Sequence, residues 1–218
     1  LVISEFGDVN SEDTHAKTQW QIFYEISGEG ECVYELECAK TLTRLSVPAM
    51  VLDPETDYAW RVRVYDNRGA VSEWSDYGYF TTGENPEDAD NDGIVDDQMP
   101  VPEADVDGDG TADSDQAGIK SIRANATGNL VGIKAETGSN VVRIVSVRSS
   151  DPADTALYPE MTGVPGDLPY GLLDFKVEVE NPGDTAELTI VFSRFISADA
   201  AWYKFDCIEN AWIDFTDN

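Results

Sequence analysis

Basic residues are scarce in this chain of 218 residues: 14 lysines and arginines stand against 43 aspartates and glutamates, and the formal charge is −29. A surface of this sign repels phosphate groups, which argues strongly against nucleic acid or an anionic membrane as a partner. Long apolar runs are also lacking, and none approaches the ~20 residues that a membrane-spanning helix requires. We therefore expect no nucleic-acid binding and no membrane insertion. The surplus of carboxylates suggests divalent cations, or simply solubility at high ionic strength.

The side chains of common catalytic machinery are equally sparse. The chain has one histidine, His15, and no nucleophile elbow that would supply a serine or cysteine for it to activate. Carboxylates are abundant, but the clustered ones fit closed cation-binding loops rather than an open catalytic site. We expect no catalytic residues, no organic cofactor and no enzymatic activity.

Cysteine is too rare to build a disulfide scaffold. Of the three, Cys32, Cys38 and Cys207, at least one is left unpaired within a monomer. Cys32 and Cys38 lie on one face of a predicted strand, roughly 20 Å apart at about 3.3 Å per residue, which is too far for a bond. Cys207 falls in a predicted turn, as a free thiol or as a link to another chain. The cysteine pairing and the redox compartment therefore stay open.

Short apolar patterns of period two are frequent and are typical of strands with one buried face. Before residue 84 they predict strands at residues 19–26, 32–38, 42–47, 58–65 and 77–82. Near the other end, alternation over 175–179 is followed by turn residues at 181–184 and by a returning strand over 188–192.

The chain length suits two domains of roughly 100 residues each. We predict an all-β protein with two β-sandwich domains, residues 1–83 and 119–218. A helix-free, calcium-binding acidic segment, residues 84–118, joins them.

Residues 84–116 contain thirteen acidic residues and no lysine or arginine, a composition that by itself favours a disordered linker. Their spacing overrides this interpretation, because the pattern of residues 88–96 recurs at 105–113. Each copy has aspartates at positions 1, 3, 5 and 9, a backbone carbonyl at position 7, and at position 6 a glycine that allows a sharp turn around a cation. The predicted ligands of two or more Ca²⁺ ions are Asp88, Asp90, Asp92, Ile94, Asp96 and Asp97, and Asp105, Asp107, Asp109, Thr111, Asp113 and Asp115.

These loops do not fit an EF-hand. Position 12 holds Met99 and Gln116 instead of a bidentate glutamate, and Pro100 and Pro102 prevent an exiting helix after the first loop. The loops resemble thrombospondin type 3 repeats, which are free of helices, wind around Ca²⁺ and share ligands between neighbours. The resemblance covers about 30 residues and departs from the family at position 12. Mg²⁺ is less favoured, because it prefers rigid octahedral sites that keep several waters.

The run from Leu52 through Tyr58 to Val64, followed by Ser-Glu-Trp-Ser at 72–75, resembles a fibronectin type III domain. The resemblance implies that Tyr58 is a corner residue whose hydroxyl bonds to upstream backbone. It also implies that Trp74 stacks on the outward-facing Arg61 and Arg63, an arrangement that we interpret as structural rather than as a binding surface. The family's first strand has no counterpart before Leu1.

The runs at 168–175, 181–185 and 202–205 resemble choice-of-anchor domains of bacterial secreted and surface proteins, which often follow calcium repeats. This resemblance implies an extracellular or cell-surface location. The family's last strand has no counterpart after residue 215.

Two functions remain open. Sandwiches with a missing terminal strand accept a strand from another molecule, which favours a calcium-stabilised structural subunit of a cell-surface fibre or filament, a homopolymer joined by strand exchange. A truncated sequence would produce the same appearance. The alternative is a cell-surface adhesin or binding module, in which exposed aromatics such as Trp74, Trp202 and Trp212 contact a glycan, a protein or a surface.

Overall fold

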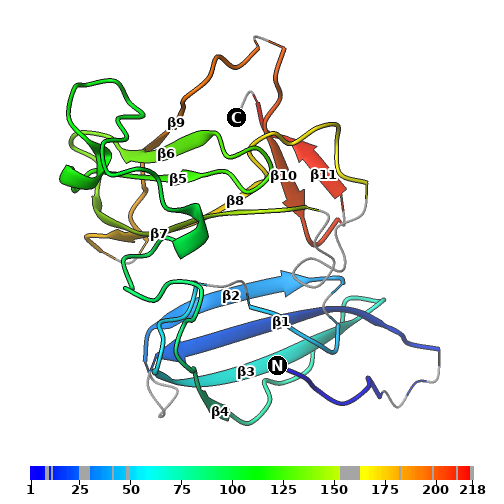
Figure 1. The fold of residues 1–218 in the computed structure, drawn as a ribbon. Coiled ribbons are helices and arrows are strands. Elements are labelled where there is room, and N and C mark those ends of the chain that lie inside the picture. Colours follow the sequence, from blue (N-terminus) through cyan, green and yellow to red (C-terminus); the bar gives the residue numbers. More distant parts are fainter. Residues whose placement is uncertain are drawn as a thin grey trace. The chain divides into compact units, whose positions relative to one another are not determined.

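A computed structural model describes all residues except 8, 9, 11, 25–29, 41, 48, 49, 153–162, 182, 198, 210, 217 and 218. Strands dominate the described residues, which contain no α-helix and only two 3-10 helices, η1 (Asp96–Gln98) and η2 (Asp113–Asp115). The predicted all-β class is therefore confirmed (Figure 1). Within the same residues, no helix is long and apolar enough to cross a membrane.

The chain forms two compact units that do not follow each other in sequence. The first consists chiefly of Leu1–Glu84 and Trp202–Asn218, and the second chiefly of the residues between them. The second unit is thus inserted into the first. The sequence-based division assigned residues 202–218 to the 119–218 sandwich and set 84–118 apart as a joining segment, whereas in the structure residues 202–218 group with the first unit and the acidic segment groups with the second.

The first unit is built on a four-stranded antiparallel sheet with the order β2-β1-β3-β4. Its strands are β1 (His15–Tyr24), β2 (Cys32–Cys38), β3 (Asp57–Asp66) and β4 (Gly78–Thr81). Because side chains alternate across a strand, Trp20 and Ile22 of β1 and Tyr58 and Val62 of β3 all reach one face, where they form the core with Leu45. Four of the five strands predicted before residue 84 therefore exist.

The fifth predicted strand, residues 42–47, is reduced to one bridge between Val2 and Arg44. Hydrogen bonds flank this bridge, from Ile3 N to the Thr43 carbonyl and from Leu45 N to the Leu1 carbonyl, both 2.9 Å. Leu45 is nonetheless almost fully buried. The apolar alternation predicted a strand here, but alternation carries no information about how many residues form a ladder.

Charged and aromatic side chains cover the opposite face of this sheet. The Trp74 ring lies between the guanidinium groups of Arg61 and Arg63, at 4.5 and 4.6 Å from them, which confirms the predicted stack. Gln21 and Gln19 accept hydrogen bonds from the Nε atoms of these two arginines. Each arginine is thus held by the Trp74 ring and by a glutamine of the neighbouring strand β1, in agreement with a structural role.

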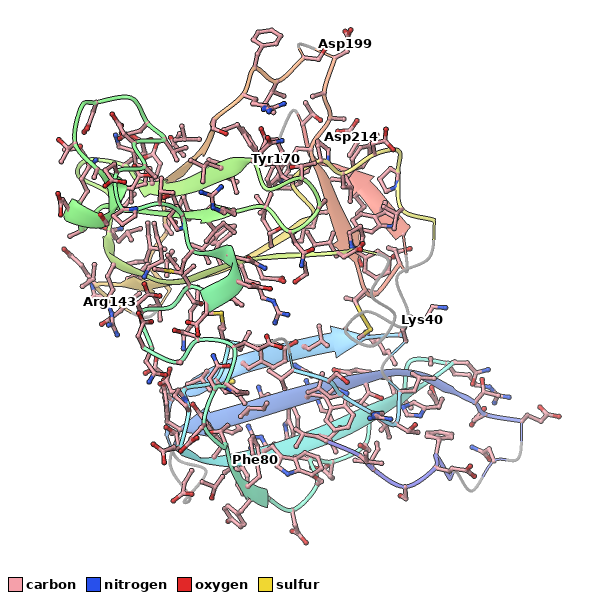
Figure 2. The ribbon with its side chains drawn as sticks, viewed as in Figure 1. Lys40, Phe80, Arg143, Tyr170, Asp199 and Asp214 are labelled. Atoms are coloured by element: carbon pink, nitrogen blue, oxygen red, sulfur yellow. A yellow bond between two sulfur atoms is a disulfide. The ribbon has the colours of Figure 1, made fainter. Side chains whose placement is uncertain are left out.

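A two-stranded hairpin, β10 (Tyr203–Asp206) and β11 (Ala211–Asp214), completes the first unit. The turn between its strands carries Cys207, which forms a disulfide with Cys38 at the end of β2; the bond is visible beside Lys40 in Figure 2. Both sequence-based options for Cys207, a free thiol and a link to another chain, are therefore wrong. Cys32 is the free cysteine, and it is exposed.

The second unit packs a three-stranded sheet, β5-β6-β9, against a two-stranded sheet, β7-β8. Its strands are β5 (Ile119–Arg123), β6 (Leu130–Ala135), β7 (Val141–Ser150), β8 (Leu172–Val179) and β9 (Leu188–Phe192). The core between the two sheets includes Ile122, Val131, Ile133, Val147 and Tyr170.

The predicted turn after β8 is present, with the Asp184 amide donating to the Asn181 carbonyl at 3.0 Å, but the strands on its two sides do not pair. β8 pairs with β7, whereas β9 pairs with β6 in the other sheet. A hairpin and a crossover between layers share the same strand–turn–strand sequence pattern. The choice between them depends on which edge strands are available.

The first unit's core contains a specific hydrogen bond that can be tested. The buried Tyr58 hydroxyl accepts a hydrogen bond of 2.8 Å from the Asp53 amide, five residues upstream. Replacing Tyr58 with Phe leaves this amide without its partner, so we expect the first unit to lose about 1–3 kcal/mol of unfolding free energy. All five tryptophans belong to the first unit, and urea unfolding followed by tryptophan fluorescence therefore measures this loss.

Tyr79→Phe is the matched control, because Tyr79 lies on the same sheet but is 56% exposed. Its loss should stay within about 0.5 kcal/mol. Equal losses for the two variants would show that the Tyr58 hydroxyl has no special role.

Candidate metal centre

The two acidic loops adopt the same local backbone structure. In each, the carboxylate at position 1, Asp88 or Asp105, accepts hydrogen bonds from the amides at positions 5 and 6, over 2.9–3.1 Å. The amide at position 9 donates to the carbonyl just before the loop at 2.7 Å in both copies. The position-6 glycines, Gly93 and Gly110, have φ of +86° and +91°, the left-handed region that favours glycine. The repeat in the sequence is therefore a repeat in structure.

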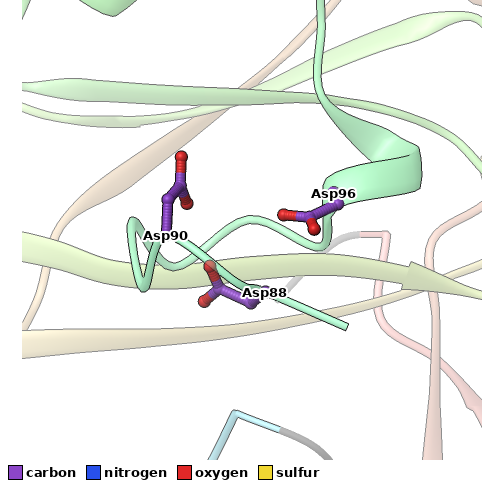
Figure 3. A group of neighbouring side chains, drawn as sticks. All are labelled: Asp88, Asp90 and Asp96. Atoms are coloured by element: carbon purple, nitrogen blue, oxygen red, sulfur yellow. The ribbon is translucent and has the colours of Figure 1, made fainter. Parts of the chain in front are cut away.

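Each loop brings three carboxylates together, those of positions 1, 3 and 9. The side chains of Asp88, Asp90 and Asp96 each place a ligand oxygen within 4.8 Å of the others, and Figure 3 shows them on one turn of chain that leads into η1. Asp105, Asp107 and Asp113 form the equivalent group. These two clusters could each hold a metal ion.

Four of the predicted side-chain ligands, Asp92, Asp97, Asp109 and Asp115, lie outside these clusters. The position-5 carboxylates, Asp92 and Asp109, fold back to accept hydrogen bonds from the amides two residues later, at 2.7 and 2.8 Å. Neither cluster includes Asp97 or Asp115. Of the two position-7 residues, Thr111 uses its carbonyl to accept a hydrogen bond from the Gln116 side chain, and Ile94 packs its side chain into the core.

The electrostatic environments of the two clusters differ. Burial raises the pKa of Asp88, which is 4% exposed, and the Gly93 amide that it binds opposes this shift. No described lysine or arginine forms an ion pair with Asp88, Asp90 or Asp96. In the second cluster, a hydrogen bond from Lys134 lowers the pKa of Asp107, and the same bond raises the pKa of Lys134.

The donor set fits a hard divalent cation. Two unit charges 4 Å apart repel by about 1 kcal/mol in water and about 4 kcal/mol at an effective dielectric of 20, so three converging carboxylates need a positive partner. All side-chain donors are carboxylate oxygens, the ligands that Ca²⁺ and Mg²⁺ prefer, whereas Zn²⁺ prefers nitrogen and sulfur. The described lysine nearest the first loop, Lys120, donates to the Asp92 carbonyl and forms no ion pair with the three carboxylates, so the first cluster is the stronger candidate.

The first loop is also part of the second unit's sandwich. The Gly93 carbonyl accepts a hydrogen bond of 3.0 Å from the Val147 amide, and Ile94 forms a parallel bridge with Val147 of β7. The Ile94 side chain, 6% exposed, belongs to the hydrophobic core. A cation held by this loop would therefore be tied directly to the packing between the two sheets.

Gln98 is an important residue of this loop that the sequence analysis missed. Its side-chain amide donates to the Ser149 carbonyl at 2.7 Å and accepts from the Ser149 amide at 2.8 Å, so that it extends the edge of β7 as a strand would. The side chain is buried. The repeat itself gave no signal for this residue, because the two loops differ at position 11 as they do at every position except 1, 3, 5, 6 and 9.

The second loop is held by polar contacts instead. Lys134 of β6 forms an ion pair of 2.6 Å with Asp107. Gln116, at position 12, donates its side-chain amide to Asp109 at 3.3 Å and to the Thr111 carbonyl at 3.2 Å. Thr111 is exposed, whereas its counterpart in the first loop is buried. The two loops thus share their backbone structure and differ in how they attach to the sandwich.

Comparison with protein families gives a match that lies almost entirely within the first unit. Residues 9–85 match a family model described as "Rha78A-like, N-terminal immunoglobulin domain", a range that includes all four strands of the β2-β1-β3-β4 sheet. This part of the chain is an immunoglobulin-like β domain. Comparison with curated proteins gives no match, and comparison with solved structures gives none either.

The match to the immunoglobulin-like domain ends at the start of the acidic segment. The finer resemblances, to fibronectin type III domains, thrombospondin type 3 repeats and choice-of-anchor domains, therefore stay predictions. Calcium likewise stays a prediction, because the acidic clusters establish only that a metal ion could be held.

Substitution of the two position-6 glycines tests whether the two acidic loops attach differently to the sandwich of the second unit. Alanine at either position adopts an unfavourable left-handed conformation, which costs about 1–2 kcal/mol. At Gly110 the added Cβ meets nothing within 4 Å, but at Gly93 it lies 2.0 Å from the Val145 carbonyl oxygen of β7. We expect Gly93→Ala to lower the unfolding free energy of the second unit by about 4 kcal/mol or more, and Gly110→Ala by no more than about 2 kcal/mol.

Scanning calorimetry in the presence of a chelator measures both variants without an influence from bound metal. Tryptophan fluorescence is the internal reference, because it follows the immunoglobulin-like unit, which should not change. Similar losses in Gly93→Ala and Gly110→Ala would contradict the docking of the first loop on β7.

Proposed function

We propose that this chain is a calcium-stabilised structural module of an extracellular or cell-surface protein. An immunoglobulin-like domain is typical of extracellular and surface modules. The disulfide between Cys38 and Cys207 supports the same location, because disulfides persist in oxidising compartments. The observation that carries the proposal is the continuity between the first carboxylate cluster and the core of the second unit.

Calcium is the ion that best suits the clusters. Ca²⁺ takes six to eight oxygen ligands in flexible geometry, so three carboxylates can be supplemented by backbone carbonyls, neighbouring aspartates and water. Asp88, Asp90 and Asp96 would hold one ion, and Asp105, Asp107 and Asp113 would hold another. Each ion supplies positive charge that offsets the repulsion among the carboxylates.

Ion binding at the first cluster would stabilise the sandwich through the contacts on both sides of Ile94. Asp88 and Asp90 precede Ile94, while Asp96 begins η1, which ends at Gln98 with its two hydrogen bonds to Ser149. When one ion holds Asp88, Asp90 and Asp96 together, the chain between them is fixed where Ile94 enters the core. Calcium would therefore act on the second unit and leave the immunoglobulin-like unit unchanged.

Thermal unfolding with calcium or chelator tests this proposal. A ligand that binds only the folded state stabilises it by about 1.4–2.7 kcal/mol per site at ten to a hundred times its Kd. We expect millimolar Ca²⁺ to raise the calorimetric transition of the second unit, while the tryptophan fluorescence transition of the first unit stays in place. Mg²⁺ at the same concentration should raise the transition less.

Charge-neutralising variants assign the effect to the clusters. Asp90→Asn together with Asp107→Asn keeps the side-chain size and removes one carboxylate from each cluster, so most of the calcium-dependent shift should disappear. Glu103→Gln is the matched control, since Glu103 is an exposed acid of the same segment that belongs to neither cluster. An unchanged calcium response in the double variant would contradict the proposed sites.

The finer proposal is that the module is a subunit of a surface fibre, assembled as a homopolymer by strand exchange. It is supported by the second unit, in which β7 is the one described strand that pairs with β8. Phe175 on this strand is 41% exposed. A strand at the edge of a sheet can pair with a strand from another chain, and an exposed aromatic side chain favours such a contact.

Sedimentation velocity in millimolar calcium tests this assembly. We expect concentration-dependent association of the wild-type chain, which Phe175→Lys weakens because a charge on an edge strand opposes pairing. Phe195→Lys is the control, because Phe195 is 93% exposed and lies outside the strands. A monomer at high concentration, or equal effects of the two variants, would reject strand exchange at β8.

The adhesin alternative has less support from the predicted aromatic platforms. The Trp74 ring lies between two guanidinium groups, and Trp212 packs edge to face against Phe205. Trp202 is 38% exposed, but one partly exposed ring does not form a platform for a glycan. The adhesin becomes the better proposal if the chain does not assemble.

A further inference from the structure

The disulfide of the first unit closes an unusually long covalent loop. Cys38 and Cys207 are separated by 169 positions in the sequence. The loop between them contains β3, β4, the acidic segment, the entire sandwich of the second unit, and β10. Only the first 38 residues and the residues from Cys207 onward lie outside it.

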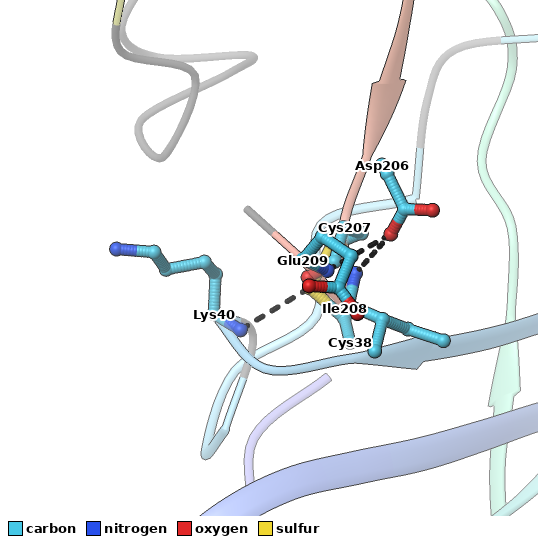
Figure 4. The surroundings of a disulfide bond; sticks show 6 residues. All are labelled: Cys38, Lys40, Asp206, Cys207, Ile208 and Glu209. Carbon is cyan, nitrogen blue, oxygen red and sulfur yellow. Dashed lines mark hydrogen bonds between the residues drawn. A yellow bond between two sulfur atoms is a disulfide. The ribbon is translucent and has the colours of Figure 1, made fainter. Parts of the chain in front are cut away.

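Both cysteines are fixed within the fold of the first unit. Cys38 is fully buried at the end of β2, and the Ala39 amide next to it donates to the Cys207 carbonyl at 3.2 Å. The turn that carries Cys207 is held by the Asp206 carboxylate, which accepts from the amides of Ile208 and Glu209 at 2.8 and 2.9 Å (Figure 4). The bond therefore joins two ordered elements.

We infer that this disulfide is a mechanical bypass, which keeps tension applied along the chain away from the second unit. A pulling force enters before Cys38 and leaves after Cys207. Because the disulfide is the shortest covalent path between these points, the closed loop of residues 39–206 cannot be extended. The acidic loops and the sandwich that they stabilise would keep their structure while the protein carries load.

The load instead falls on the strands outside the loop. β1 is the central strand of this part, paired with β2 on one side and with β3 on the other. Its ladder with β3 runs from His15 to Tyr24. Extending residues 1–38 therefore requires β1 to separate from β3, which lies inside the closed loop. The immunoglobulin-like sheet would carry the applied force, and the inserted unit would be free of tension.

Single-molecule force spectroscopy on the full chain between two marker domains tests this inference. Opening the bond adds 169 positions to the extensible chain, or about 560–610 Å at 3.3–3.6 Å per residue. We expect the wild-type chain to show a fully extended length shorter by this amount than that of Cys207→Ser, or of the wild type with a reductant. Cys32→Ser is the matched control, because it removes the exposed free cysteine and should extend like the wild type.

The fully extended length depends on the covalent path and not on whether a variant folds, so a folding defect in Cys207→Ser does not affect the comparison. Equal lengths for the wild type and Cys207→Ser without reductant would overturn the inference. The same force measurement with calcium and with a chelator distinguishes this inference from the proposed function. Chelation should leave the unfolding forces of the wild type unchanged, even if calcium stabilises the second unit in calorimetry. If chelation lowers the unfolding forces of the chain with an intact disulfide, then tension reaches the second unit and the inference is wrong.

Discussion

The structure of the second unit depends on the attachment of the first acidic loop to β7. A hydrogen bond from Val147 to the Gly93 carbonyl and the burial of Ile94 hold the loop on the sandwich. The same turn brings three carboxylates together, and their repulsion opposes the attachment. The hydrophobic core and the charge cluster therefore act on the same residues in opposite directions. A divalent cation held by these carboxylates would remove this conflict, which is the physical basis of the proposed link between metal binding and stability in this unit.

The two loops show how one sequence pattern serves different purposes in different surroundings. Their backbones make equivalent hydrogen bonds, because positions 1, 5, 6 and 9 carry the same residue types. The first loop has an apolar residue, Ile94, at position 7 and enters the core. The second has Thr111 there, stays exposed, and relies on Lys134 and Gln116. One loop is thus part of the sandwich, and the other is attached to its surface.

The insertion of one unit into the other gives the disulfide its importance. A bond between neighbouring parts of one sheet would only stabilise that sheet, but the two cysteines here flank the whole inserted unit in the sequence. In the chain-entropy view, a loop of this length gives close to the largest stabilisation that a disulfide provides, about 5 kcal/mol. The two chain segments that lead into and out of the inserted unit are therefore joined covalently within the first unit.

The sequence by itself determined the features that depend on local spacing. Period-two alternation was enough for the all-β class, and the repeat from Asp88 to Asp96 was enough for the turn geometry, because each loop closes within nine residues. The Tyr58 hydroxyl bond, which spans five residues, was implied by the resemblance to a fibronectin type III domain and not by spacing. Tertiary structure alone decided the Cys38–Cys207 pairing, the separation of β8 and β9 into different sheets, and the docking of Gln98 on Ser149. These contacts join residues far apart in the chain, and they depend on which edges and surfaces the packed core leaves available, a property that no local pattern records.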